Sequence, residues 1–257
     1  MSLIAREISV RLGRTPVLQG VSVQARAGEV TAIVGPNGSG KTTLMRCLTG
    51  ELAYTGCITL GGTDIAAMSP AALARRRGVL PQSAALAFPF TVAEVVRIGP
   101  EARGERADAL VPLALQAVDL AGFAGRLYQE LSGGEQQRVQ LARVLAQVWQ
   151  PVDATGPRWL LLDEPVSSLD IAHQLTVMRL AADYARCGGG VVAVMHDLNL
   201  TALFAQRLIL LGGGRVLHQG TPTEVLTDSL LSQAYGCRLR VNTVPEHGIW
   251  VLPHAAA

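Results

Sequence analysis

The sequence predicts an α/β fold with a mostly parallel sheet and an inserted helical subdomain. Apolar runs alternate with stretches of helical spacing over most of the 257 residues, the pattern of a parallel sheet covered by helices. Between about residues 86 and 145 the strand-like runs vanish and helical spacing dominates. We therefore expect one domain, 1–257, with its core in 1–85 and 146–257 and a helical subdomain at about 86–145.

The core strands are predicted from two patterns. Residues 8–12, ISVRL, alternate between apolar and polar side chains, as in an antiparallel strand with one solvent-exposed face. The apolar run 208–211, a three-glycine turn and residues 215–218 predict a hairpin. Uninterrupted apolar runs predict strands buried on both faces, here 30–34, 159–162 and 191–195.

Three further segments complete the predicted elements. The insert ends in a helix, because four apolar residues recur on one helix face: Leu141, Val144, Leu145 and Val148. Residues 150–158 carry Pro and Gly and are predicted to form a loop back to the core. Residues 220–257 are expected to hold a short helix and a strand at 240–244.

Bulk composition limits the possible functions. A net charge of +2 gives no electrostatic basis for binding nucleic acid, and the basic run 75–77 is expected to be a solvated helix face. The four cysteines form no CxxC pair, which disfavours a zinc or iron–sulfur site and fits a reducing cytosol.

The chain is not expected to cross a membrane by itself. Arg6 and Glu7 lie where a signal peptide needs its apolar stretch. No apolar run approaches the ~18 residues that span a bilayer. The mean hydropathy of +0.30 is nevertheless high for a soluble protein, which indicates surface covered by a partner.

A phosphate-binding loop is predicted between the strand at 30–34 and an apolar helix. Residues 35–42, GPNGSGKT, match G-x-x-x-x-G-K-[ST] in full. Its glycines let backbone N–H groups point at the β- and γ-phosphates, while the lysine supplies charge and the threonine a hydroxyl for Mg²⁺. Kinases, GTPases and helicases share this motif, and a glycine-rich turn without a ligand is the alternative. The predicted ATP-binding residues are Gly35, Pro36, Asn37, Gly38, Ser39, Gly40, Lys41, Thr42 and Thr43.

Two acids follow the apolar run at 159–162. Ligands bind at such strand ends in open α/β sheets, and Pro165 indicates that the strand stops there. Asp163 suits the coordination shell of Mg²⁺, and Glu164 suits a general base that activates the attacking water. An ordinary helix-capping role for these acids is the alternative.

Residues 131–137, LSGGEQQ, narrow the class of protein. Ser132 and Glu135 fit a capping box that opens a helix to about Val148. A capping box does not explain Gly133 and Gly134 in the first turn, whereas bare N–H groups beside a hydroxyl would bind an anion. The stretch resembles the LSGGQ signature of the ABC ATPases, with Glu135 where Gln is commoner.

Other segments of the sequence also resemble motifs of that family. Gln82 matches the Q-loop, Asp170 the acid of the D-loop, and His196 the switch histidine. The resemblance implies catalytic roles for Glu164, His196 and Gln82, and Mg²⁺ ligation by Thr42, Gln82 and Asp163. His173, His218, His247 and His254 lack such context and are expected to be surface or packing residues.

The resemblance covers nearly the whole chain and implies a P-loop NTPase fold. That fold has a RecA-like core, an antiparallel β-subdomain and the helical insert. It implies that two copies sandwich two ATP molecules, each P-loop facing Ser132, Gly133, Gly134 and Glu135 of the other copy. The family's adenine-stacking aromatic is missing from residues 10–14, so Leu12 or Arg11 is expected to cover the base. Val166 stands where the family usually has Thr.

Together these features predict an ATPase subunit of an importer, peripheral on the cytoplasmic face of the inner membrane. Its expected partners are a second copy, two permease subunits and, indirectly, a periplasmic binding protein. FPFTV at 88–92 and VMHDLNL at 194–200 resemble the iron-chelate, cobalamin and haem importer group, haem importers most of all. Siderophore or cobalamin import and a soluble non-transport ABC ATPase are the alternatives. Phe88 and Phe90 are expected either to contact the permease or to be core residues of the insert.

Overall fold

A six-stranded sheet forms the middle of the computed structural model, which describes residues 1–82, 88–101, 108–244, 247–249 and 251. The strand order is β12-β11-β3-β10-β9-β6, parallel throughout except for the β11–β12 pair. The predicted buried strands and the hairpin are therefore confirmed. The strands are β3 (Val30–Val34), β6 (Arg77–Leu80), β9 (Trp159–Asp163), β10 (Gly190–Val194), β11 (Arg207–Gly212) and β12 (Arg215–Gly220).

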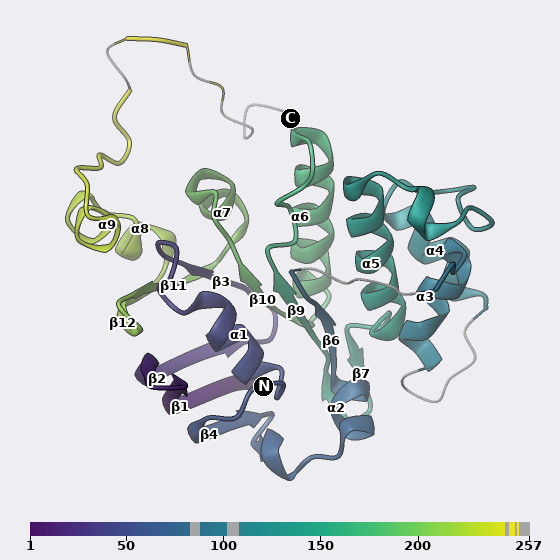
Figure 1. Cartoon of the computed structure of the whole chain (residues 1–257), viewed down its shortest axis with the longest axis horizontal. Coiled ribbons are helices and arrows are strands. Elements are labelled where there is room, and N and C mark those ends of the chain that lie inside the picture. The colour runs from purple at the N-terminus through teal and green to yellow at the C-terminus, as the bar shows by residue number, and fades with distance from the viewer. Residues whose placement is uncertain (83–87, 102–107, 245–246, 250, 252–257) are drawn as a thin grey trace.

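A second, antiparallel sheet carries the N-terminus (Figure 1). Its order is β2-β1-β4-β5, with β1 (Ser2–Leu12), β2 (Thr15–Arg26), β4 (Thr55–Leu60) and β5 (Thr63–Asp64). The strand predicted at 8–12 is only the second half of β1. Two consecutive exposed residues, Arg6 and Glu7, sit at a shift in register, and Glu7 has a φ of +53°. The alternation of buried and exposed residues changes phase there, so the sequence pattern did not predict the first half of the strand.

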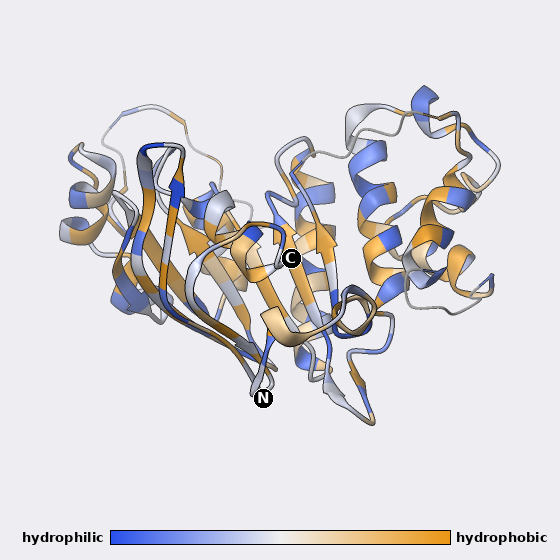
Figure 2. Cartoon of the chain, turned by 60° about the horizontal axis from the view of Figure 1, so that its bottom comes forward, coloured by the Kyte–Doolittle hydropathy of each residue, from blue (hydrophilic) through white to orange (hydrophobic). Residues whose placement is uncertain are grey.

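The two faces of the central sheet pack against different layers. Val30, Ala32 and Val34 of β3 join the core shared with the helices, while Ile33 joins the core shared with the antiparallel sheet. Leu44 of α1 (Lys41–Leu48) lies in the second core. Successive side chains of a strand point to opposite faces, so one apolar run supplies both cores. Figure 2 shows hydrophobic residues along the central strands and on the helix faces that meet them.

Three helices lie at one side of the central sheet (Figure 1): α3 (Val92–Glu101), α4 (Leu110–Ala117) and α5 (Gly133–Gln147). They occupy the range expected for the insert. Helix α3 approaches α5 closely at Gly99, where a Cβ would lie 2.1 Å from the Arg143 carbonyl oxygen. Val144 of α5 in turn packs on Gly78 of β6. The last turn of α5 thus joins the core, and the boundary at residue 145 stays a prediction.

Two predicted segments differ from the structure. Residues 150–158 hold a short hairpin of β7 (Val152–Asp153) and β8 (Gly156–Pro157) rather than a plain loop. Arg158 stabilises it by donating to the Asp153 carboxylate at 2.7 Å and to the Gln150 carbonyl. No strand forms at 240–244, where Asn242 has a left-handed φ of +55° and the chain is mostly exposed.

The basic run at 75–77 is only partly solvated, contrary to expectation. Arg75 and Arg76 end helix α2 (Pro70–Arg76), but Arg77 turns inward and its guanidinium donates to the Thr49 carbonyl. Burial lowers the pKa of Arg77. Arg77 therefore ties β6 to the end of α1.

The remaining described helices complete the cover of the sheet. They are η1 (Ile65–Ala67), η2 (Tyr128–Glu130), α6 (Ile171–Arg186), α7 (Leu198–Phe204), α8 (Pro222–Val225) and α9 (Asp228–Tyr235). Within the described part of the chain, no helix combines the length and the apolar character needed to cross a membrane.

Candidate nucleotide site

The loop between β3 and α1 requires glycine at two positions. Gly35 has a φ of +147°, and a Cβ there would lie 2.2 Å from the Leu211 carbonyl oxygen. Gly40 caps α1 in a left-handed conformation with a φ of +100°, and a Cβ there would lie 2.6 Å from Cδ2 of Leu18. Side chains other than hydrogen are excluded at both positions. The loop is therefore held in one curled path against β2 and β11.

A polar cavity of about 520 Å³ opens above this loop. The loop and the start of α1 form its floor, and segments distant in sequence form its walls. It gathers nine of the predicted site residues, together with Val17 of β2. The lining residues are Val17, Asn37, Gly38, Gly40, Lys41, Thr42, Thr43, Gln82, Glu164 and His196.

Lys41 is the buried cation of the site. Its Nζ donates to the carbonyl oxygens of Gly35 and Pro36, at 2.9 and 3.0 Å. Burial lowers the pKa of Lys41, while the charges of Glu164 and Asp163 act in the opposite direction. An anion in the cavity would give the ammonium a stronger partner than two neutral carbonyls.

Thr42 and Asp163 lie together beneath the cavity. Oγ1 of Thr42 and Oδ1 of Asp163 are 3.5 Å apart, and Asp163 is 5% exposed. Burial, and then the charge of Glu164, raise the pKa of Asp163 to about 6. A cation would relieve this buried carboxylate, so the donor set fits Mg²⁺. Since the described residues contain no group of three or more His, Cys, Asp or Glu able to hold a metal, phosphate oxygens and water would complete the shell.

Glu164 reaches the same site through an unusual backbone conformation. Adjacent side chains of a strand diverge, but Glu164 has a φ of +53°, which ends β9 and turns the chain. Its Oε1 lies 2.6 Å from Nε2 of His196, which follows β10. Two acids from one strand end and a histidine from the next strand thus meet at the edge of the cavity.

The signature segment lies outside this cavity. Ser132 and Glu135 form the predicted capping box: the Ser132 N–H donates to the Glu135 carboxylate at 2.7 Å, and the Glu135 N–H donates to Oγ of Ser132. Ser132 and Gly133 are exposed, and a Cβ at Gly133 would meet nothing within 4 Å. This helix end therefore faces solvent, with two bare N–H groups available to a ligand from outside the subunit.

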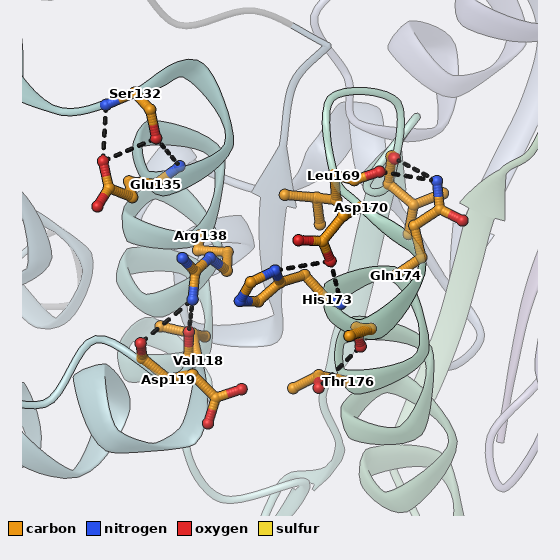
Figure 3. A network of polar contacts seen from close by, with 12 residues as sticks. Val118, Asp119, Ser132, Glu135, Arg138, Leu169, Asp170, His173, Gln174 and Thr176 are labelled. Atoms are coloured by element: carbon orange, nitrogen blue, oxygen red, sulfur yellow. Dashed lines mark hydrogen bonds and ion pairs between the residues drawn. The ribbon is translucent and has the colours of Figure 1, made fainter. Parts of the chain in front are cut away.

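Asp170 serves as the N-cap of α6. Its Oδ1 accepts from the His173 N–H at 2.9 Å and lies 2.8 Å from Nδ1 of His173. Figure 3 shows the His173 ring between Asp170 and Arg138 of α5. The printed polar contacts of His173, expected to be a surface or packing residue, are both with Asp170 at the start of its own helix.

Three residues near the site were not predicted from the sequence. Val17 lines the cavity, whereas neither Leu12 nor Arg11 does, and Leu12 is 50% exposed on the β1–β2 hairpin. Burial raises the pKa of Tyr235 of α9, and the nearby backbone of Gly35 acts in the opposite direction. Gln137 of α5 donates to the Glu164 carbonyl. No local motif marks them, because each contact joins segments far apart in the chain.

Comparison with known proteins matches this geometry to one family. Residues 18–167 match the model described as ABC transporter. A hemin import ATP-binding protein of Roseobacter denitrificans is 63% identical over 100% of this chain and 99% of its own. Another, from Rhizobium meliloti, is 58% identical over 98% of each chain.

Solved structures agree in fold. The ATP-binding subunit of an ABC transporter has a TM-score of 0.78 at 22% identity, covering 90% of this chain and 95% of that one. A bacterial Atm1-family ABC exporter with ATP bound has a TM-score of 0.76 at 27% identity, covering 88% and 39%. Fold and site define a P-loop nucleotide-binding domain, as predicted. The chain belongs to the ABC transporter family.

Proposed function

We propose that this chain binds and hydrolyses ATP with Mg²⁺ as the ATP-binding subunit of a haem importer. The observation that carries the proposal is the pairing of Glu164 with His196 at 2.6 Å in the cavity above the P-loop. The names of relatives 54–63% identical to the chain support the cargo, since each is a hemin import ATP-binding protein.

The geometry accounts for each step of the reaction. The loop N–H groups and Lys41 hold the phosphates, and Thr42 and Asp163 hold Mg²⁺, with Gln82 reaching the cavity from the end of β6. When bound there, Mg²⁺ would supply positive charge that offsets the charge of the phosphates. Glu164 accepts the proton of the attacking water. His196 orients that carboxylate and, in the proposed complex, contacts the γ-phosphate.

Replacing the base tests the hydrolytic role. Glu164→Gln should keep ATP binding and lower turnover by at least ~10², because the amide cannot accept the water's proton. Glu101→Gln, at the exposed end of α3, is the matched control and should hydrolyse ATP normally. Hydrolysis at the normal rate in Glu164→Gln would refute the assignment.

The active unit is proposed to be a dimer. The exposed signature and the P-loop cavity do not meet within one subunit, which supports a composite site in which Ser132, Gly133, Gly134 and Glu135 complete the site of a second copy. Chains carrying Ser132→Arg should be inactive alone, as should chains carrying Lys41→Ala. Mixing them should restore one of the two sites. Full activity in a dilute monomer would contradict this arrangement.

The permease contact is proposed at Phe88, with the chain peripheral on the cytoplasmic face of the membrane. Phe88 is 68% exposed, whereas Phe90 packs on the main core and contacts Phe88 edge-on at 6.3 Å between centroids. Phe88→Ala should reduce co-purification with permease subunits in mild detergent. Leu113→Ala, another exposed apolar residue, is the control. Equal recovery of the complex with both variants would disprove the contact.

Cargo is tested by uptake in a strain that lacks this subunit. Loss of growth on haem as sole iron source, with siderophore and cobalamin use intact, supports haem import through a permease pair and a periplasmic binding protein. Intact growth on haem with loss of either other nutrient overturns it. Failure of the chain to purify with any membrane protein favours a non-transport ABC ATPase.

A further inference from the structure

The side-chain amide of Gln137 hydrogen-bonds to both ends of the turn from Glu164 to Ser168. Its Nε2 donates to the carbonyl oxygen of Glu164 at 3.0 Å. Its Oε1 accepts from the backbone N–H of Ser168 at 3.3 Å. Because Gln137 belongs to α5 and the turn follows β9, these bonds join two separate elements.

The Glu164–Ser168 turn depends on support from outside. The left-handed φ of Glu164, +53°, is a conformation that non-glycine residues hold only where surrounding contacts over-determine it. Its carbonyl also receives the N–H and Oγ–H of Ser167, but these contacts are longer, at 3.4 and 3.3 Å. The bond from Gln137 is the shortest of the three.

Helix α5 also begins with the signature segment. A Cβ at Gly134 would lie 3.2 Å from the Ser168 carbonyl oxygen, so the first turn of α5 packs directly on the same turn. Figure 3 views this pair of helices, with Ser132 and Glu135 at the start of α5 and Asp170 at the start of α6. The amide of Gln137 therefore connects the helix that begins with the signature to the carbonyl of Glu164.

Neighbouring glutamines of α5 have different partners. Gln136 donates to the carbonyls of Tyr128 and Leu131, and Gln140 donates to the hydroxyl of Tyr128. Both bind the segment just before α5. Gln136 and Gln140 thus stabilise the helical region, whereas Gln137 contacts the Glu164–Ser168 turn. Replacing Gln136 is therefore a matched control for replacing Gln137.

We infer that Gln137 is a positioning residue, which couples the place of the signature helix to the orientation of Glu164. The inference rests on the proposed role of Glu164 as general base. It requires at residue 137 a side chain that donates to the carbonyl and accepts from the N–H at once, as the glutamine amide does. The carboxylate of Gln137→Glu has no donor, and Gln137→Met has no hydrogen-bonding group of comparable strength.

The test measures kcat, KM for ATP, affinity for a fluorescent ATP analogue and thermal stability in the full chain. Gln137→Met and Gln137→Glu should each lower kcat by ~10-fold or more, since small misplacement of a catalytic group has effects of this order. KM and nucleotide affinity should change less than ~2-fold. Gln136→Met should match Gln137→Met in lost thermal stability while keeping kcat. If Gln137→Met does not fold, the Gln137→Glu values decide.

A double-mutant comparison separates this inference from the proposed function. In a Glu164→Gln background, Gln137→Met should lower the residual turnover no further, because it acts through Glu164. A further ~10-fold loss in that background would overturn the inference, as would normal kcat in Gln137→Met. Normal turnover in Glu164→Gln alone would instead overturn the role of Glu164, and the inference with it.

Discussion

Asp163→Asn should stabilise the nucleotide-free chain while removing its response to Mg²⁺. The pKa of this buried carboxyl rises from 3.8 to about 6. One pKa unit corresponds to about 1.4 kcal/mol, so ionisation at pH 8 opposes folding by about 3 kcal/mol. Asparagine keeps an oxygen for the Thr42 hydroxyl but carries no charge. We expect the variant to be more stable by about 2–3 kcal/mol at pH 8.

The sign of the pH dependence is part of the prediction. An acid whose pKa is raised on folding opposes folding fully above its folded pKa and not at all below its unfolded pKa. The advantage of Asn should therefore be full above about pH 7, about 1.5 kcal/mol at pH 5, and nearly absent below pH 4.

Urea unfolding at pH 8, 5 and 4 measures this difference, and Asp183→Asn, on the exposed surface of α6, is the control. Mg²⁺ with a non-hydrolysable ATP analogue should stabilise the wild type more than Asp163→Asn. A variant less stable than the wild type at pH 8, or a pH-independent difference, would refute the reasoning.

Two further predictions concern positions away from the cavity. Arg158→Met should lower stability by about 2–3 kcal/mol, since it leaves a partly buried Asp153 without its ion pair. Burial raises the pKa of Asp153, but bonds from Thr155 and Arg158 outweigh this and hold it at about 2. The loss seen in urea unfolding should thus be present above pH 4 and shrink towards pH 2; a loss that persists at pH 2 contradicts it. Gly99→Ala should cost about 1–3 kcal/mol by forcing α3 away from the Arg143 carbonyl, and an unchanged melting temperature would contradict that.

Local patterns predicted the elements that depend on neighbouring residues alone. The P-loop, the acid pair and the capping box each occupy a few consecutive positions, and the buried strands are continuous apolar runs. Each lies where expected. The roles of Gln82 and Asp170 came from family resemblance and stay predictions, because their positions at the cavity and at the start of α6 do not by themselves define a catalytic role.

What the sequence could not predict depends on distant contacts. Gln137 looks like any polar residue of an amphipathic helix until β9 places the Glu164 carbonyl beside it. Val17 becomes a lining residue only because β2 passes the P-loop, as the approach of Leu18 to Gly40 shows. The first half of β1 was missed for a different reason, since a register shift broke the alternation on which the prediction depended.

The site places groups together that are unfavourable without a ligand. Asp163 is buried beside a second acid, Glu164 is held in a left-handed conformation, and the buried Lys41 donates to two neutral carbonyls. A magnesium–nucleotide complex would supply a cation for the acids and an anion for the lysine. Binding of this complex would remove these unfavourable interactions, and the free energy released would add to the affinity for the ligand. Because the ligand binds the folded state alone, it would also stabilise the fold. The bonds that join Gln137 to the turn at Glu164 hold this strained turn in the free chain, in the place where we propose that a general base and the signature helix of a second copy act.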